Sequence, residues 1–262
     1  MSYTVHHASA TQAEYVILSS GLGGHRQFWA PQIPVLQQYF HVVTYDQEGC
    51  HHDSAALAEH YSVGHMAQQV LNLIQTLKIS KFHFIGHALG GHIGLELSTL
   101  QAAHNFEILS LGLINAWGEL DAHTQKCFAT RRTLLNAAGA DAYVRAQALF
   151  LYPPAYISKH HEKITQVENA QLLDFPPSHN VLARLNAVQN FALQDRHLTA
   201  LEHVPVHLFA NTDDFLVPFS QSKKLLEKIP TAQYHEFATG GHASTISEPE
   251  IMNKALLQAL KN

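Results

Sequence analysis

One short stretch of this sequence has the spacing of a catalytic turn but lacks its reactive side chain. Gly86, Ala88 and Gly90 follow the pattern G-x-S-x-G of a nucleophile elbow, in which glycines leave room for a strained residue between a strand and a helix. Alanine stands where that pattern has serine. Because alanine has no atom that can attack a carbonyl carbon, we exclude catalysis through a covalent ester at this position.

A few other residues are of types that could do chemistry. Cys50 is a candidate substitute nucleophile, although a free cysteine is more often an inert apolar residue. Asp214 and His242 follow later predicted strands, with Asp213 as the neighbouring alternative to Asp214. Aspartates are common in turns for structural reasons, and we expect Asp46 to be one of these.

The elements that must position these residues alternate between strand and helix. This alternation indicates an α/β fold with a mostly parallel sheet flanked by helices, which binds its ligands at the carboxyl ends of the strands. Four turns lie at such ends, at residues 21–24, 86–90, 213–214 and 240–242. The apolar runs that predict strands lie at 14–20, 41–45, 82–85, 108–115, 206–210 and 233–237.

The alternation stops in the middle of the chain. Helical patterns predominate there, at residues 124–138, 141–149, 156–173 and 179–193, and proline pairs separate some of them. We therefore predict a helical cap at 117–203, inserted into an α/β core formed by 1–116 and 204–262. The substrate pocket is expected between the cap and the carboxyl edge of the sheet.

The composition favours a small-molecule partner. Of the 262 residues 14% are charged and the formal net charge is −5, which gives no basic surface for nucleic acid or an anionic membrane. The N-terminal residues lack a targeting pattern and no apolar run is long enough to span a membrane, so we expect a cytoplasmic protein. The two cysteines have no paired spacing, which indicates a reducing compartment.

Histidine is abundant, with 21 residues, but its spacing does not indicate a metal site. The pairs at 6–7, 51–52 and 160–161 are adjacent in sequence, and neighbouring side chains on a helix or strand point to different faces. No H-E-x-x-H motif is present. We therefore expect no metal and no cofactor, and we interpret His87 and His92, beside Ala88, as packing or hydrogen-bonding residues.

Several phrases of the sequence resemble those of the α/β-hydrolase superfamily. They are S-S-G-L-G-G at 19–24, G-H-A-L-G-G at 86–91, D-x-x-V-P at 214–218 and G-G-H at 240–242. The resemblance implies that Asp214 is the acid and His242 the base of a triad. It also implies an oxyanion hole made by the backbone N–H groups of Leu22 and Leu89.

Further phrases resemble hydrolases of the Rut pyrimidine-utilisation pathway, including Y-D-Q-x-G at 45–49, H-T-Q-K-C-F at 123–128 and R-L-N-A at 184–187. This resemblance implies a role in uracil nitrogen assimilation. The reaction would be hydrolysis of carbamate to ammonia and carbon dioxide, or of aminoacrylate to malonic semialdehyde and ammonia. Both reactions also proceed unaided, so an enzyme without a nucleophile could accelerate them by activating water with His242 in the space at Ala88.

The size of the expected acceleration fits such substrates. A serine hydrolase that has lost its nucleophile retains roughly 10³- to 10⁴-fold acceleration over water, which is useful only for a labile substrate. Two other interpretations stay open. One is a non-catalytic protein that binds a metabolite, and the other is a serine esterase that carries an engineered Ser-to-Ala change.

An anionic substrate requires a cation, and the predicted cap offers arginines. Arg131, Arg132 and Arg184 are among the candidates, and Arg131 is preferred because apolar residues three and four positions away mark its side of the helix as buried. Trp117, His123 and Tyr152 are expected to shape the pocket. The oligomeric state cannot be predicted from these patterns.

Overall fold

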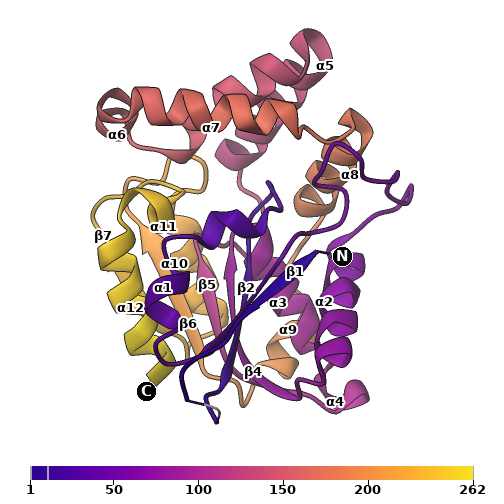
Figure 1. The fold of residues 1–262 in the computed structure, drawn as a ribbon, viewed down its shortest axis with the longest axis vertical. Helices are drawn as coiled ribbons and strands as arrows, with labels where there is room; N and C mark the ends of the chain where they lie inside the picture. Colours follow the sequence, from indigo (N-terminus) through magenta and orange to yellow (C-terminus); the bar gives the residue numbers. More distant parts are fainter. Residues whose placement is uncertain (1, 11, 262) are drawn as a thin grey trace.

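The computed structural model describes residues 2–10 and 12–261, and its centre is a seven-stranded sheet (Figure 1). The strand order across the sheet is β1-β3-β2-β4-β5-β6-β7. All pairings are parallel except that of β1 with β3, so the mostly parallel sheet predicted from the sequence is confirmed. The strands are β1 (Tyr3–His6), β2 (Tyr15–Ser19), β3 (His41–Tyr45), β4 (Lys81–His87), β5 (Glu107–Ile114), β6 (Val206–Asn211) and β7 (Gln233–Phe237).

The edge strand β1 was not predicted. It is only four residues long and none of its residues is fully buried, so it has no apolar run of the kind that marks the central strands. Its register, with Tyr3 opposite Tyr45 and His6 opposite Val42, places it antiparallel to β3 at the edge of the sheet. Antiparallel edge strands are common on otherwise parallel sheets.

Helices cover both faces of the sheet and enclose two apolar clusters. Side chains of β2 alternate between them, because Ile17 belongs to one cluster and Val16 and Leu18 to the other. The larger cluster includes residues of α2 (Val63–Leu77) and α3 (Leu89–Ser98). The smaller one lies beneath α1 (Ile33–Leu36) and α12 (Pro249–Lys261), which lie on the other side of the sheet in Figure 1.

The remaining helices are short, apart from those above the sheet. None of the helices in the described residues is long and apolar enough to cross a membrane. The helices not yet named are η1 (Arg26–Trp29), α4 (Gln101–His104), α5 (Ala122–Leu151), α6 (Pro154–Lys159), α7 (His161–Leu173), α8 (Ser178–Gln189), α9 (Asp195–Ala200), α10 (Phe219–Lys228) and α11 (Ser244–Ser247).

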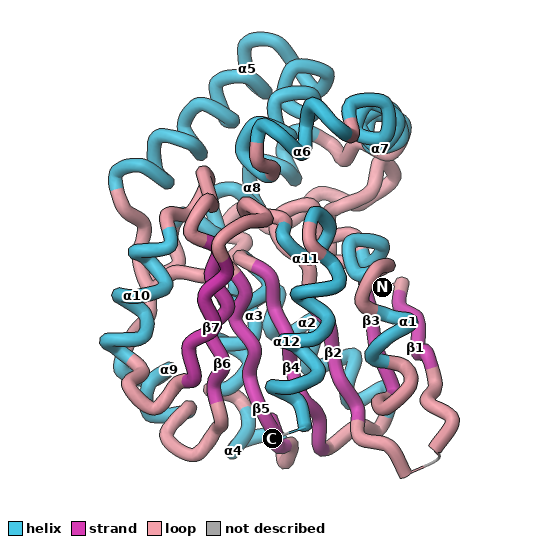
Figure 2. The backbone as a smooth tube through the Cα atoms, turned by 90° about the vertical axis from the view of Figure 1, so that its left-hand side faces the viewer, coloured by secondary structure: helices cyan, strands magenta, loops and turns pink. Residues whose placement is uncertain are grey.

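Helices α5 to α8 form a layer above the carboxyl ends of the strands (Figures 1 and 2). The two helices predicted at 124–138 and 141–149 are the two halves of α5, which is interrupted at Gly139 with a φ of 79°. Such a φ is unfavourable for residues with a Cβ, and the glycine therefore sets the bend. We refer to α5–α8 as the cap.

The cap is shorter than the predicted 117–203. The backbone N–H of Leu193 donates to the carbonyl of Gly118 at 2.7 Å, so the chain leaves and re-enters the core at adjacent points. Helix α9 lies beyond this point and contacts α3 of the core. There Arg196 and His197 both bind the carboxylate of Glu96, at 2.8 Å and 2.9 Å, and fix α9 to the core. The pattern of α9 is helical like that of the cap, which is why the sequence did not separate them.

Candidate active site

The turn between β4 and α3 has the strained geometry of a nucleophile elbow although it carries alanine. Ala88 has φ 48° and ψ −110°, and its side chain is 5% exposed. A Cβ at Gly86 would lie 2.2 Å from the backbone of Gly90, and a Cβ at Gly90 would lie 2.1 Å from the carbonyl oxygen of Ser19. Only glycine fits at these two positions, so the G-x-A-x-G spacing follows from the close contact of β2, β4 and α3.

Asp214 and His242 form a buried pair at the same edge of the sheet. Oδ2 of Asp214 lies 2.8 Å from Nδ1 of His242, and the two side chains are 1% and 3% exposed. Oδ1 of Asp214 accepts from the backbone N–H of Val217 at 2.8 Å, which fixes the carboxylate. Nε2 of His242 has no hydrogen-bond partner among the described residues, and His242 lines a cavity. Nε2 is therefore free to form a hydrogen bond with a molecule in that cavity.

Asp213, the alternative acid, has a different role in the structure. Its carboxylate accepts from the backbone N–H groups of Gly240 and Gly241, at 3.1 Å and 2.9 Å. The two adjacent aspartates thus have different partners: Asp213 binds the loop before His242, and Asp214 binds the His242 ring. The carboxylate that contacts the His242 ring is thus that of Asp214 and not that of Asp213.

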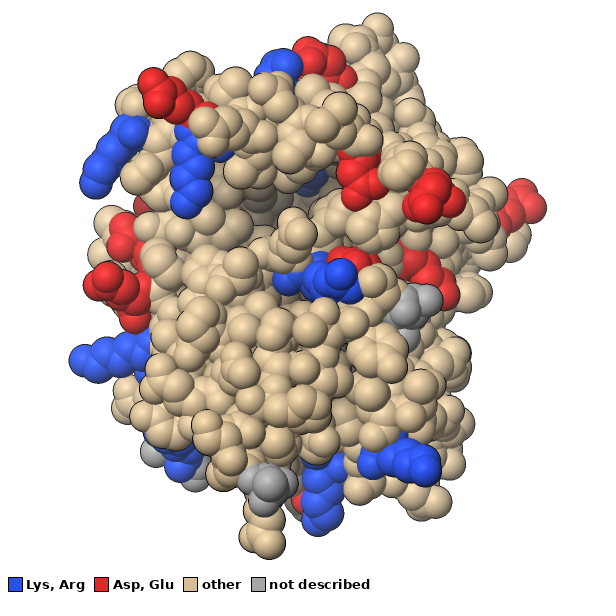
Figure 3. Space-filling view, in the orientation of Figure 1, with Lys and Arg blue, Asp and Glu red and all other residues tan. Residues whose placement is uncertain are grey.

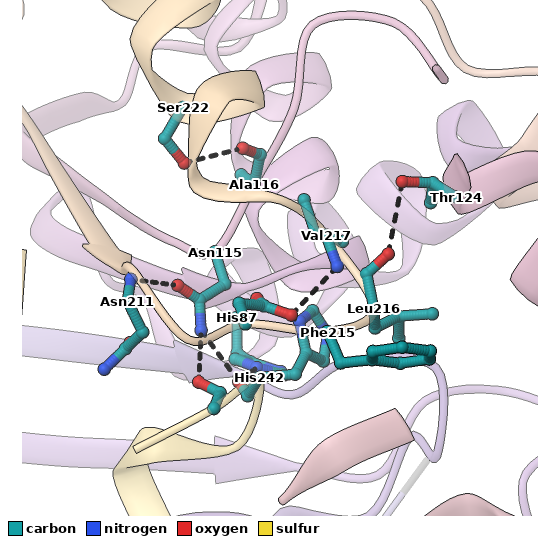
Figure 4. Close-up of polar contacts among 12 residues, drawn as sticks. His87, Asn115, Ala116, Thr124, Asn211, Phe215, Leu216, Val217, Ser222 and His242 are labelled. Carbon is teal, nitrogen blue, oxygen red and sulfur yellow. Dashed lines mark hydrogen bonds and ion pairs between the residues drawn. The ribbon is translucent and has the colours of Figure 1, made fainter. Parts of the chain in front are cut away.

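Asn115, at the end of β5, also fixes the position of His242, and the sequence analysis missed it. Its Nδ2 donates to the carbonyl of His242 at 2.8 Å, and its Oδ1 accepts from the N–H of Asn211 at 3.2 Å (Figure 4). Asn115 has a φ of 49°, a conformation in which asparagine is enriched. Asn115 directly follows a buried strand, as the turn of Asp214 does, and this position in the sequence could have identified it as a site residue.

His87 supports the same loop from below. Its Nε2 donates to the carbonyl of His242 at 2.8 Å (Figure 4), and its ring lies 4.7 Å from that of His242. Burial, and next the charge of a protonated His242, lower the pKa of His87 to about 3. His87 is therefore neutral at ordinary pH and acts as a hydrogen-bond donor, as the sequence analysis expected.

The candidate oxyanion donors lie at the ends of β2 and β4. Leu89 is the first residue of α3, so its N–H has no acceptor within the helix. The N–H of Leu22 likewise makes no hydrogen bond among the described residues, and both residues line the cavity. Free N–H groups at these two positions are what an oxyanion hole requires.

Arg184 was expected to bind substrate, but the structure gives it another role. Its guanidinium donates to the backbone carbonyls of Leu22 and Glu48, both at 2.9 Å, and to Oε1 of Gln47 at 2.5 Å. Arg184 does not line the cavity next to His242. These bonds go to two main-chain oxygens and one side-chain oxygen, so Arg184 joins the loop that carries Leu22 to the loop that carries Gln47 and Glu48.

A cavity of about 410 Å³ lies between this edge of the sheet and the cap, and Figure 3 shows a hollow between cap and core. The core contributes Leu22, Ala88, Leu89 and His242 to its lining. The cap side is mostly apolar, and it includes Phe128, Leu151 and Val188 together with two of the residues expected from the sequence, Trp117 and Tyr152. His123 does not line the cavity; its Nε2 lies 2.5 Å from the carbonyl of Phe215 and fastens α5 to the loop after Asp214.

Arg131 is the basic cap residue that lines this cavity next to His242, and Asp174, between α7 and α8, is an acidic one. It is 4% exposed, as the apolar residues on its side of the helix predicted, and Nη2 donates to the hydroxyl of Tyr143 at 3.0 Å. Nε is buried without a partner. No carboxylate in the described residues forms an ion pair with Arg131. Since a buried unpaired charge is costly, the site is suited to an anion supplied by a ligand.

A second group of reactive side chains lies beside the loop that carries Leu22. One ligand atom from each of His25, Asp46, Cys50 and His51 lies within 4.8 Å of the others, although the sequence predicted no metal site. Cys50 does not line the cavity next to His242, and burial raises the pKa of its thiol to about 12. Cys50 thus lies outside the lining of the cavity that Ala88 lines and has a raised thiol pKa, which argues against its use as a substitute nucleophile.

Comparison with known proteins agrees with this architecture. Residues 14–124 match a family model described as the alpha/beta hydrolase fold. The chain is similar in structure to an enol-lactonase from Burkholderia xenovorans LB400, with a TM-score of 0.86 at 23% sequence identity, covering 100% of this chain and 96% of the other. At that identity the likeness concerns the fold alone.

The relatives in sequence are more specific. The chain is 51% identical over 261 residues to a protein of Acinetobacter baylyi named "Putative carbamate hydrolase RutD", covering 100% of this chain and 98% of the relative. A protein of the same name from Caulobacter vibrioides is 39% identical over 261 residues, covering 100% and 95%. The fold, the elbow and the full-length similarity together place this chain in the RutD family of α/β hydrolases.

Proposed function

We propose that this protein accelerates the hydrolysis of a small labile anion, carbamate or aminoacrylate, with water activated by His242 and without a serine nucleophile. The observation that carries the proposal is that a base, an alanine turn and a buried cation line one cavity, in His242, Ala88 and Arg131. The name of the relatives supports carbamate as one candidate. Hydrolysis of aminoacrylate would use the same three residues, because aminoacrylate and its product both carry a carboxylate that Arg131 can bind.

In this mechanism Arg131 binds the carboxylate of aminoacrylate, or one oxygen of carbamate, and the carbon that bears nitrogen faces Ala88. Nδ1–H of His242 donates to Asp214, and Nε2 takes a proton from a water that occupies the space beside the alanine methyl group. With carbamate, the water oxygen bonds to the carbonyl carbon as the C=O π electrons move onto oxygen, His242 returns its proton to nitrogen, and the oxygen pair re-forms C=O to give bicarbonate, the hydrated form of carbon dioxide.

With aminoacrylate, the enamine first tautomerises to the imine, its second carbon gaining the proton that nitrogen loses. Water then adds to the imine carbon as the C=N π electrons move onto nitrogen, His242 protonates that nitrogen, and the hydroxyl loses its proton as C=O of malonic semialdehyde forms. In both reactions the carbon–nitrogen bond breaks as C=O forms, and ammonia leaves.

Charge that develops on oxygen during this reaction is stabilised by the free N–H groups of Leu22 and Leu89. These donors require no particular side chain and so are unaffected by the loss of serine at the elbow. Arg184, Asn115 and Asp213 hold the loops that carry the donors and the base. Preorganisation of this kind is what survives when a nucleophile is removed, at roughly 10³- to 10⁴-fold over water.

The cavity volume fits an attack by water. At about 410 Å³ it is many times the ~30 Å³ that one water occupies in the liquid, so it holds a small anion together with several waters. The Asp214–His242 pair argues against a protein that only binds a metabolite, because binding alone needs no oriented base. The other alternative is that Ala88 is an engineered replacement of serine. The native coding sequence decides this, because it shows whether serine or alanine is encoded at position 88.

The experiment that tests the proposal measures release of ammonia from each candidate substrate, with and without protein, at matched pH. We expect acceleration of one of the two reactions above its spontaneous rate. His104→Ala, which alters an exposed histidine of α4 far from the cavity, should behave like the wild type. Equal rates with and without protein for both substrates would favour the non-catalytic alternative.

A further inference from the structure

The group formed by His25, Asp46, Cys50 and His51 has the donor types and spacing of a transition-metal site. Its ligand atoms lie within 4.8 Å of one another, and Nε2 of His51 is 3.4 Å from Oδ2 of Asp46. This separation is long for a hydrogen bond. It matches the distance between two ligands in a tetrahedral site, because metal–ligand bonds of about 2.1 Å separate neighbouring ligands by about 3.4 Å.

A second carboxylate orients one of these ligands. Nδ1 of His51 lies 2.6 Å from Oδ2 of Asp174, which leaves Nε2 directed toward Asp46. His52 binds the other oxygen of Asp174 at 2.7 Å, so the two adjacent histidines converge on one carboxylate and do not point apart as the sequence analysis assumed. A carboxylate bound to the remote nitrogen of a histidine is the usual outer partner of a metal-ligating histidine.

The ligands come from loops after two adjacent strands. His25 follows the turn after β2, and the other three residues follow β3, which pairs with β2 in parallel. Cys50 is 1% exposed, whereas the side chain of His51 is 33% exposed. Asp46, His51 and Asp174 also line an open groove on the surface, which gives an ion an access path, and His25 and Asp174 line the cavity next to His242 as well.

We propose that His25, Asp46, Cys50 and His51 bind one divalent transition-metal ion, of which Zn²⁺ fits best. Two imidazoles, one thiolate and one carboxylate suit a borderline ion in tetrahedral geometry and do not suit Mg²⁺ or Ca²⁺, which prefer all-oxygen ligands. On binding, the Cys50 thiol releases its proton to solvent and its sulfur bonds to the metal. The longest ligand separation must shorten by about 1 Å for bonds of 2.0–2.3 Å, which the half-buried His25 can accommodate.

Charged neighbours set the electrostatics of this site. Arg26 lies 3.3 Å from Oδ2 of Asp46, and Arg184 lies beside Gly24 and Cys50. These cations weaken metal binding, while Asp174 favours it. The ion replaces the long contact of Arg26 with Asp46 and joins the loop of His25 to that of Cys50. Its role is then structural, since it stiffens the segment next to the Leu22 N–H, and its ligand His25 lies at the wall of the cavity next to His242.

Cobalt titration of the purified full-length protein tests this site, because Co²⁺ replaces Zn²⁺ and a cobalt–thiolate bond gives a charge-transfer absorption band in the near ultraviolet. We expect one equivalent of Co²⁺ to produce this band, and Zn²⁺ to abolish it by displacement. Cys50→Ser should remove the band. Cys127→Ser is the matched control, since Cys127 is also buried and lies 3.5 Å from a histidine nitrogen of His123, and it should leave the band unchanged.

Zinc affinity, measured against a competing chelator, provides the second readout. His51→Ala changes a partly exposed side chain and should weaken Zn²⁺ binding at least tenfold, and Asp174→Asn should weaken it by about 10- to 100-fold. Zinc should also raise the melting temperature of the wild type and not that of His51→Ala. The proposal is overturned if the wild type shows no thiolate band, or if Cys50→Ser and His51→Ala bind zinc as tightly as the wild type.

Discussion

Replacement of Arg131 by methionine should separate anion binding from the rest of the site. Methionine keeps most of the side-chain volume beneath the cap and removes the buried charge. We expect the variant to fold and to bind a small dicarboxylate such as malonate at least tenfold more weakly than the wild type. Arg131→Lys keeps the charge but loses the planar pair of donors, so its affinity should lie between the two.

The magnitude follows from the surroundings of Arg131. Only the hydroxyl of Tyr143 accepts a hydrogen bond from the guanidinium among the described residues, and Nε is buried without a partner. A carboxylate in the cavity would form about two charge-assisted hydrogen bonds, each worth roughly 1.5–3 kcal/mol. Desolvation and loss of motion of the ligand oppose most of this gain. A remainder of at least about 1.4 kcal/mol corresponds to the tenfold change in Kd.

Isothermal titration calorimetry at constant ionic strength measures this change. Arg132→Met is the matched control, because Arg132 is the next residue of α5 but binds Asn186 and Gln189 and does not line the cavity. Its affinity for malonate should equal that of the wild type. If Arg131→Met and Arg132→Met bind malonate equally well, the anion is not held by Arg131 and the reasoning from its unpaired charge is wrong.

Three further predictions concern the elbow, the oxyanion loop and acid stability. Ala88→Ser should create weak activity on nitrophenyl acetate, read by absorbance, because base and oxyanion donors are already in place; complete inactivity would mean that the site cannot support a nucleophile. Arg184→Lys should reduce the hydrolytic acceleration about tenfold, because a weaker bond to the Leu22 carbonyl makes the loop of the Leu22 N–H more mobile. Malonate affinity should stay the same, and an unchanged rate would contradict the positioning role of Arg184. Burial lowers the pKa of His92 to about 3, so stability due to His92 is complete above its unfolded pKa of 6.5 and is lost as the pH falls toward 3. His92→Phe should therefore make the fall in melting temperature over this range shallower than in the wild type, and equal slopes would contradict the assignment.

Much of the fold was predictable because the central strands and their turns have strong local signals. The buried strands are continuous apolar runs, and the glycines at 86 and 90 are required by contacts that no other residue allows. The helix of Arg131 was oriented correctly from its apolar neighbours alone, since helical periodicity fixes which side is buried. The edge strand β1 and the end of the cap were not predicted from the sequence, because both depend on pairing with distant parts of the chain.

Side-chain partners were less predictable than positions. Arg184 and Arg131 lie in similar helical patterns, yet one finds main-chain acceptors and the other does not. The group of His25, Asp46, Cys50 and His51 forms only because β2 and β3 are neighbours in the sheet. No spacing rule for metal ligands covers residues that meet across two loops, so the histidine pattern alone gave the wrong expectation of where these side chains point.

The effect of His242→Ala on ammonia release tests the central claim most directly. If His242 activates the attacking water, the variant should lose most of the acceleration that the wild type shows, since a general base contributes about 10²- to 10⁴-fold. Malonate binding, measured in parallel, should be retained because Arg131 is intact. Ammonia release by His242→Ala at the rate of the wild type, from a folded protein, would contradict water activation by this histidine.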